Sequence, residues 1–209
     1  MSSAVKEGRP YRTQLRQEQA QLTRQRILDA ARNLLVRGGY SQVTMHDVAE
    51  EAGVAYQTVY SQFGNKIRLA QELCDVGFPH VADALALLAQ ARDAGDPEGW
   101  LRTLGTVARR LCEPCADLLR FMRESGDPQL EGRFKEIERG RHERLAELGP
   151  QLERSGRLRP GLSGAEAVDL VWTLAGPETY EQLVLDRKWS PERFERWLSA
   201  ALVDLVLAN

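Results

Sequence analysis

The sequence predicts an all-α chain, with a small N-terminal three-helix domain followed by a larger helical domain. We expect about nine helices in total, because apolar residues recur at helical spacing between glycine and proline breaks. No stretch alternates in the way that a half-buried strand would. With 43% hydrophobic and 28% charged residues, the 209-residue chain has the composition of a folded globular protein.

The segment from Thr44 to Phe63 predicts two short helices joined by a tight turn. Thr44 and Asp47 match the capping pattern in which side-chain oxygens accept from the first N–H groups of a helix. Gly53 lies where this helix must end, because glycine adopts a positive φ without strain. The following residues, Tyr56 to Phe63, are mostly polar, so they are better explained by an external partner than by packing. This layout is that of a helix-turn-helix, whose second helix enters the DNA major groove.

Helices are also expected on both sides of this motif. Thr23 opens a first helix, which ends at the Gly38–Gly39 pair. Asn65 caps a fourth helix that runs roughly over 66–76. Residues 1–72 carry a net charge of +3 and the remainder a net charge of −5, which suits a protein that approaches DNA with its N-terminal end.

The segment from Thr23 to Leu73 resembles the DNA-binding domain of the TetR (tetracycline-repressor) family of bacterial transcription regulators. It covers about a quarter of the chain, and its specificity comes from many spaced positions that agree at once: Thr44, Asp47, Val48, Ala49, Ala52, Gly53, Val54, Thr58, Val59, Tyr60, Phe63, Lys66 and Leu69. Near the C-terminus, Gly176 to Tyr180, Trp189 to Glu192 and Trp197-Leu198 are similar to the last two helices of many members.

The resemblance implies a homodimeric regulator that binds a palindromic operator in double-stranded DNA and is released by a small, largely apolar ligand. It implies a helix-turn-helix domain over residues 22–73 and a ligand-binding and dimerisation domain over 74–209. Residues 1–21 are then a basic tail, which is either flexible and solvated or an arm with further DNA contacts. We expect no cofactor and no metal.

By position, the resemblance assigns the DNA contacts to Thr44, His46, Tyr56, Gln57, Thr58, Tyr60, Gln62 and Lys66. Tyr60 and Lys66 are expected to hold phosphates, which fix register rather than sequence. Gln57 is the preferred base reader, because a glutamine amide pairs with two positions of adenine. His46 is either a phosphate contact or an exposed bystander.

Three positions depart from the family pattern. Ala55 stands where many members have serine, so the recognition helix lacks a side-chain cap and a phosphate-binding hydroxyl. Gln62 replaces the usual histidine or tyrosine, which puts the sequence preference in doubt. Ile67 replaces a usual glutamate.

In the larger domain, large apolar residues are candidates to line the ligand pocket: Phe78, Trp100, Leu104, Leu111, Phe121, Met122 and Trp172. The last two helices repeat apolar residues at helical spacing, and pairing with the same helices of a second chain would make a four-helix bundle. The residues expected at this dimer interface are Val168, Val171, Trp172, Ala175, Phe194, Trp197, Leu198, Ala201, Leu202 and Leu205. The alternative is that these are core helices of a monomer.

Cys112 and Cys115 form a C-x-x-C pattern with three interpretations. They are unrelated cysteines at a helix junction, a redox pair that makes the chain a thiol-responsive regulator, or half of a zinc site. The zinc site needs two more ligands, and Cys74 and the three histidines show no suitable spacing.

The sequence gives little support to an enzyme. It contains no glycine-rich phosphate loop, no HExxH and no G-x-S-x-G turn, so catalysis in the helical cavity stays a remote alternative. No apolar run approaches the ~20 residues of a membrane span, and the N-terminus has no signal-peptide core. We therefore expect a cytoplasmic protein without a membrane partner.

Overall fold

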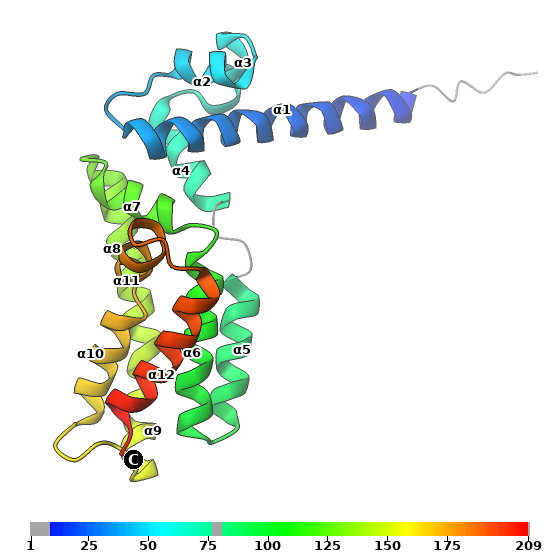
Figure 1. Cartoon of the computed structure of the whole chain (residues 1–209). Helices are drawn as coiled ribbons and strands as arrows, with labels where there is room; N and C mark the ends of the chain where they lie inside the picture. The colour runs from blue at the N-terminus through cyan, green and yellow to red at the C-terminus, as the bar shows by residue number, and fades with distance from the viewer. Residues whose placement is uncertain (1–8, 77–80, 209) are drawn as a thin grey trace, which may run out of the picture. The chain divides into compact units, whose positions relative to one another are not determined.

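The computed structural model describes residues 9–76 and 81–208, and confirms the predicted all-α class. The described residues form helices α1 to α12 and one π-helical segment, η1, with no strand beyond an isolated bridge between Leu158 and Leu207. The chain divides into two compact units, residues 1–73 and 74–209, coloured blue to cyan and green to red in Figure 1. None of the described helices is both long and apolar enough to cross a bilayer.

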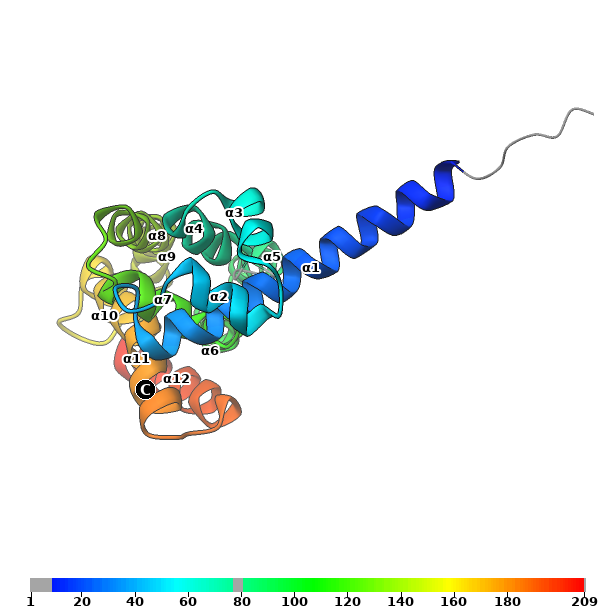
Figure 2. The same ribbon diagram turned by 90° about the horizontal axis from the view of Figure 1, so that it is seen from above.

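The first unit is a three-helix core with the start of a fourth helix. Its elements are α1 (Arg9–Gly38), α2 (Met45–Ala52), α3 (Tyr56–Phe63) and the beginning of α4 (Lys66–Val76). The helices bury an apolar core that includes Ile27, Leu35, Val48, Val59, Phe63 and Leu69. Figures 1 and 2 both show the N-terminal part of α1 extending beyond α2 and α3.

The prediction that the first helix begins at Thr23 is wrong, because α1 begins at Arg9. The Thr23 hydroxyl donates to the Gln19 carbonyl at 2.9 Å and so lies within the helix rather than at its cap. The segment 15–22 is exposed, so core packing does not hold it. Its glutamines, arginine, glutamate and leucines are good helix formers, and no breaker interrupts them. The predicted flexible tail is therefore helical from residue 9, and residues 1–8 lie outside the described residues.

The second unit contains the remaining helices. These are α5 (Val81–Asp93), α6 (Pro97–Cys112), α7 (Ala116–Glu124), α8 (Pro128–Ala146), α9 (Leu148–Ser155), α10 (Gly164–Leu174), α11 (Pro177–Tyr180), η1 (Glu181–Asp186) and α12 (Pro191–Val206). The predicted glycine and proline breaks all separate helices here. The finer division, beyond the expected nine helices, comes from short interruptions near Glu147 and at the Gly176–Pro177 pair.

Helix α6 lies at the centre of the second unit, with α12 packed along it on one side and α5 on another (Figure 1). Gly105 permits the close approach of α6 to α12. A Cβ atom at this position would lie 3.0 Å from the backbone oxygen of Glu195 and 3.0 Å from the backbone nitrogen of Ser199. Helix α10 packs against α8, α9 and α12 and completes the core.

Candidate nucleic-acid interface and ligand cavity

Helix α2 begins with the predicted capping box. The Thr44 hydroxyl accepts from the Asp47 N–H at 3.2 Å, and the Asp47 carboxylate accepts from the Thr44 N–H at 2.8 Å. The hydrogen bond from the Thr44 backbone is the main cause that lowers the pKa of Asp47. Gly53 ends the helix with a φ of 62°, as expected for a left-handed cap. Both ends of α2 are thus fixed by their own residues.

Helix α3 is anchored by two buried side chains, Val59 and Phe63. Gln57 and Tyr60 point the other way and are exposed, with Tyr60 at 57%. Ala55 precedes the helix without any side-chain cap, as its sequence predicts. A short helix that buries so little presents its polar face to solvent, which is the arrangement that a DNA-reading helix requires.

Three cationic side chains hold these helices together. The Arg26 guanidinium donates to the Ala52 carbonyl at 2.5 Å, at the end of α2. Arg24 forms an ion pair with Glu72, and its guanidinium lies 4.7 Å from the centroid of the Phe63 ring. The frame around α3 therefore depends on charge-assisted contacts as well as on apolar burial.

Lys66 is the third of these cations, and this placement corrects its predicted role. Its ammonium donates to the carbonyls of Tyr40 and Val43, at 2.7 and 3.0 Å, and lies 4.3 Å from the Tyr40 ring centroid. It therefore holds the α1–α2 connection rather than reaching outward for a phosphate. Arg68, two residues further along and exposed, is a better phosphate candidate that the family pattern did not identify. The sequence feature that could have identified Arg68 is its position in the first turn of α4. Asn65 caps this helix as predicted, because its Oδ1 atom accepts from the Arg68 N–H at 2.9 Å.

His46 is exposed, but it stacks on Tyr56, with ring centroids 4.0 Å apart and an interplanar angle of 11°. The ring centroids of Tyr56 and Tyr60 are in turn 6.1 Å apart, with an interplanar angle of 26°. This row of rings links α2 to α3 and fixes Tyr56, which is half-buried. His46 therefore has a positioning role that neither of the two alternatives anticipated.

The remaining assigned positions differ in their exposure. Thr44 is exposed, whereas Thr58 is half-buried. Gln62 is also half-buried, and its Oε1 atom is buried without a hydrogen-bond partner in the part of the chain that the structure describes. Gln62 is therefore a weaker candidate for a DNA contact than Gln57.

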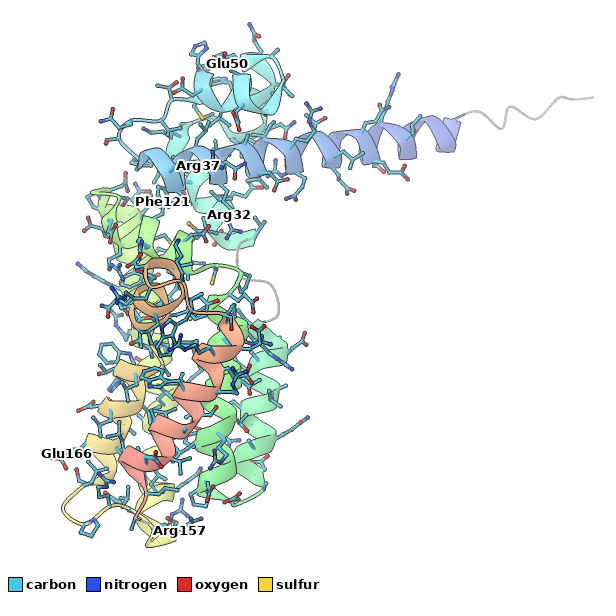
Figure 3. The ribbon with its side chains drawn as sticks, in the orientation of Figure 1. Arg32, Arg37, Glu50, Phe121, Arg157 and Glu166 are labelled. Atoms are coloured by element: carbon cyan, nitrogen blue, oxygen red, sulfur yellow. The ribbon has the colours of Figure 1, made fainter. Side chains whose placement is uncertain are left out.

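Two charged residues of this unit are labelled in Figure 3: Arg37 lies in the last turn of α1, and Glu50 is an exposed residue of α2.

Comparison with known proteins supports this domain assignment. Residues 27–73 match the family described as bacterial regulatory proteins, tetR family. The chain is 38% identical over 87 residues to the HTH-type transcriptional regulator TtgR of Pseudomonas putida, covering 42% of this chain and 41% of TtgR. Over this segment, the chain is similar to the DNA-binding domain of TetR-family regulators. It is also 46% identical over 50 residues, 24% of each chain, to the regulator AlkX of Mycobacterium tuberculosis.

The chain spans about two fifths of the length of TtgR, so more than half of each protein lies outside the match. Solved structures resemble a larger part of the chain, and at this level of identity the resemblance concerns the fold alone. NalD, the secondary repressor of the MexAB-OprM multidrug efflux pump in Pseudomonas aeruginosa, superposes with a TM-score of 0.66 at 20% identity, over 91% of this chain and 99% of NalD. The ketosteroid transcriptional regulator KstR2 of Mycobacterium tuberculosis superposes with a TM-score of 0.65 at 15% identity, over 89% of this chain and 95% of KstR2. TtgR and AlkX, with which the chain shares 38% and 46% identity over the matched residues, are both transcriptional regulators by name.

In the second unit, helices α5 to α8, together with Ala175 and Pro177, line a cavity of about 140 Å³ that is partly open to solvent. The lining residues are Val81, Leu85, Leu88, Leu104, Val107, Ala108, Leu111, Cys112, Cys115, Leu119, Ile137, Glu138, Arg141, Arg144, Leu145, Ala175 and Pro177. Most are aliphatic, and the charged ones all come from α8. The cavity is therefore an apolar chamber with one polar wall.

Two predicted pocket residues, Leu104 and Leu111, line this cavity. The other predicted residues, Trp100, Phe121, Met122 and Trp172, do not line this cavity. Phe121, labelled on α7 in Figure 3, and Met122 are core residues, and Trp100 lines a separate, more polar hollow of about 410 Å³. Helical spacing shows which residues share a face, but not which face borders a void. Phe78 lies outside the described residues.

The predicted dimer residues divide into two groups. Five are fully buried within the chain's own core, so a second chain cannot contact them: Val168, Val171, Phe194, Leu198 and Leu202. That part of the prediction is wrong because α10 and α12 use one apolar stripe to pack within the unit. The others remain at least partly exposed: Trp172, Ala175, Trp197, Ala201 and Leu205.

Cys112 and Cys115 are buried at the junction of α6 and α7, and no disulfide joins the described cysteines. Burial raises the pKa of the Cys112 thiol above its ordinary value. The Cys115 thiol donates to the Leu111 carbonyl at 2.8 Å. Because the thiolate is the reactive form, this environment disfavours the redox interpretation. Among the described residues, no group of three or more histidine, cysteine or acidic side chains is arranged to hold a metal ion.

Proposed function

We propose that this chain is a sequence-specific DNA-binding transcriptional regulator, most simply a repressor that acts in the cytoplasm. The observation that carries the proposal is the exposed polar face of α3, which is fixed on a frame of caps and cationic contacts. Gln57 and Tyr56 read base edges, and Thr44, Tyr60 and Arg68 hold phosphates. His46 orients Tyr56 through the ring stack.

A small molecule in the α5–α8 cavity regulates this activity in our proposal. Helix α8 supports the coupling, because it lines the cavity and also binds the last turn of α4. The Arg133 guanidinium donates to the Asp75 carboxylate at 2.8 Å, and Ile137, one turn further along α8, lines the cavity. A ligand that displaces α8 thereby biases α4, the helix that begins at Lys66 in the first unit.

The active form is a homodimer on a palindromic operator. A second copy packs on the partly exposed apolar side chains of α10 and α12, among which Trp197 and Leu205 offer the largest surface. Leu205 is 40% exposed, and Trp197, Ala201 and Leu205 recur every four residues, so they lie on one face of α12. Two-fold symmetry then places the two recognition helices in successive major grooves.

Selection of bound sites from random duplex DNA at physiological salt tests this function. We expect enrichment of a palindrome whose half-sites lie about one helical turn apart. Gln57→Ala should cost roughly 1–3 kcal/mol at one base pair of each half-site and relax the preference there. The exposed Ser61→Ala, on the same helix, is the matched control and should retain the wild-type preference. An unchanged site for Gln57→Ala would exclude Gln57 as the base reader, and no enrichment at all would exclude sequence-specific binding.

A further inference from the structure

We propose that the α5–α8 cavity takes a compact, uncharged, apolar molecule about the size of one aromatic ring. This inference rests on the proposed function, because it names the ligand class of the cavity that we assign to the effector. Three properties of the cavity carry it: volume, lining and the state of its charged wall.

The volume limits the ligand to a single ring or its equivalent. The cavity measures about 140 Å³, well below the roughly 300–1,000 Å³ of pockets that hold drug-sized molecules. An apolar cavity of roughly 150 Å³, engineered in another protein, stays free of water and binds benzene. The volume therefore matches a single ring better than two fused rings or a long chain.

The lining favours an apolar ligand over a cationic one. Aliphatic side chains from three helices make most of the surface, among them Leu85, Leu104, Leu111 and Leu119. None of the lining residues that the structure describes is aromatic, so this described part of the wall offers no ring face to stabilise an ammonium group. The Cys112 thiol also faces this chamber and, with its raised pKa, adds a neutral surface.

The charged wall already satisfies its own groups. The Arg141 guanidinium and the Glu138 carboxylate approach to 2.6 Å, and their side chains are only 18% and 13% exposed. Arg141 also donates to the Trp172 carbonyl at 2.7 Å and lies 5.1 Å from the Trp172 ring centroid. Arg144 is exposed, so it offers an anion no buried partner. A charged ligand would lose its hydration without gaining a counter-charge, whereas an uncharged one leaves the ion pair intact.

Calorimetric titration of the full chain, without DNA, tests the ligand class directly. The probes are toluene and phenol as neutral single rings, benzoate and benzylammonium as charged ones, and naphthalene and decan-1-ol as larger molecules. We expect Kd values of about 0.1–1 mM for toluene and phenol. The charged and the larger probes should bind at least about tenfold more weakly, through lost hydration or lack of space.

Two cavity variants sharpen the test. Ala108→Leu should fill the chamber and weaken toluene binding by about tenfold or more, because Ala108 is a buried part of its wall. Leu111→Ala should enlarge the chamber and bring naphthalene binding into the range of toluene. Val36→Ala, an apolar truncation at a partly exposed position of α1 outside the lining, is the control and should bind like the wild type. Tryptophan fluorescence checks that each variant is folded.

Tighter binding of benzoate, benzylammonium or decan-1-ol than of toluene would overturn the ligand class. If Ala108→Leu binds toluene as tightly as the wild type does, toluene does not bind in the α5–α8 cavity, and the proposed site is overturned. Release of a selected operator is measured separately, so the two proposals fail differently. Toluene binding without release rejects the regulatory role of the cavity, whereas release by charged or larger compounds alone rejects the ligand class and leaves the regulator in place.

Discussion

Each unit holds cations bound both by carbonyls and by carboxylates, as Arg24 with Glu72 and Arg141 with the Trp172 carbonyl show, but the cations at the key position of each unit differ in their partners. In residues 1–73, Arg26 and Lys66 donate to backbone carbonyls, at the end of α2 and in the α1–α2 connection. In residues 74–209, Arg120 and Arg123 converge on the buried carboxylate of Glu181, at 3.0 and 2.8 Å. A cation held by carbonyls keeps its full charge, whereas one held by a carboxylate is neutralised. The first unit thus stays basic around its exposed helix, and the second uses opposite charges to fix its interior.

The largest effect should come from the carboxylate at the centre of the second unit. Glu181 is 2% exposed and lies in the π-helical segment η1. Glu181→Ala leaves Arg120 and Arg123 without their shared partner, although Asp186 and Glu178 still bind them. Because the two guanidinium groups are about a third exposed, we expect the free energy of unfolding to fall by about 2–3 kcal/mol, less than for a fully buried pair.

Denaturant unfolding followed by tryptophan fluorescence measures this loss, since all four tryptophans lie in the second unit. The exposed neighbour Gln182→Ala is the control and should change stability by less than about 0.5 kcal/mol. A loss equally small for Glu181→Ala would show that the carboxylate contributes nothing net. The interior of the second unit would then not depend on the pairing of opposite charges around Glu181.

The next effect separates a structural cation from a DNA-binding one in the first unit. Lys66→Ala leaves the carbonyls of Tyr40 and Val43 without their donor, so we expect a loss of about 1–2 kcal/mol in the stability of this unit. Operator affinity should fall on all sequences, while its dependence on salt concentration stays that of the wild type. Arg68→Ala should do the reverse, with little loss of stability and a salt slope reduced by about one.

Circular dichroism and binding assays at several salt concentrations distinguish the two variants. A reduced salt slope for Lys66→Ala would mean that its ammonium contacts a phosphate in the complex. The role that the family pattern assigns to Lys66 would then be restored.

Local chemistry explains how far the sequence could predict each unit. In the first unit, Thr44, Gly53 and Asn65 act through their own neighbours in the chain, so their roles were readable from spacing alone. The contacts of Lys66 and His46 join residues that lie apart in the sequence or depend on ring orientation, and no spacing rule contains them. The predictions therefore succeeded where hydrogen bonds are local and failed where they depend on tertiary packing.

In the second unit the helix ends were also predictable, because glycine and proline fix them locally. The cavity and the dimer surface were not, since both depend on which face of each helix the core occupies. Leu198 and Leu205 illustrate the problem: they belong to the same apolar stripe of α12, yet one is fully buried and the other is 40% exposed. Only the arrangement of α6 beside α12 decides between them.

A smaller effect is expected from the two capping boxes, which offer a matched test between the units. Thr44→Ala removes the cap of α2, and Ser163→Ala removes the equivalent cap of α10. Each should cost about 1 kcal/mol. The first should lower operator affinity and leave tryptophan-monitored unfolding unchanged, while the second should do the opposite. A change in both readouts for either variant would show that the two units unfold as one.

The smallest effect concerns the pH dependence of the same boxes. Hydrogen bonds from Thr44 and from Ser163 lower the pKa of Asp47 and of Glu166 below their ordinary values of 3.8 and 4.5. A carboxyl with a lowered pKa in the folded state stabilises the fold when it is ionised. This contribution is therefore present at neutral pH and is lost as the pH falls below about 4. Asp47→Asn and Glu166→Gln keep an acceptor oxygen but cannot titrate.

Urea unfolding between pH 3 and 7 measures this contribution. For Glu166→Gln, the free energy of unfolding that tryptophan fluorescence reports should fall less steeply toward acid pH than in the wild type. For Asp47→Asn, only the free energy of unfolding from circular dichroism should show this smaller fall. If stability falls toward acid pH as steeply in both variants as in the wild type, the loss of stability at low pH comes from the ion pairs around Glu181 instead.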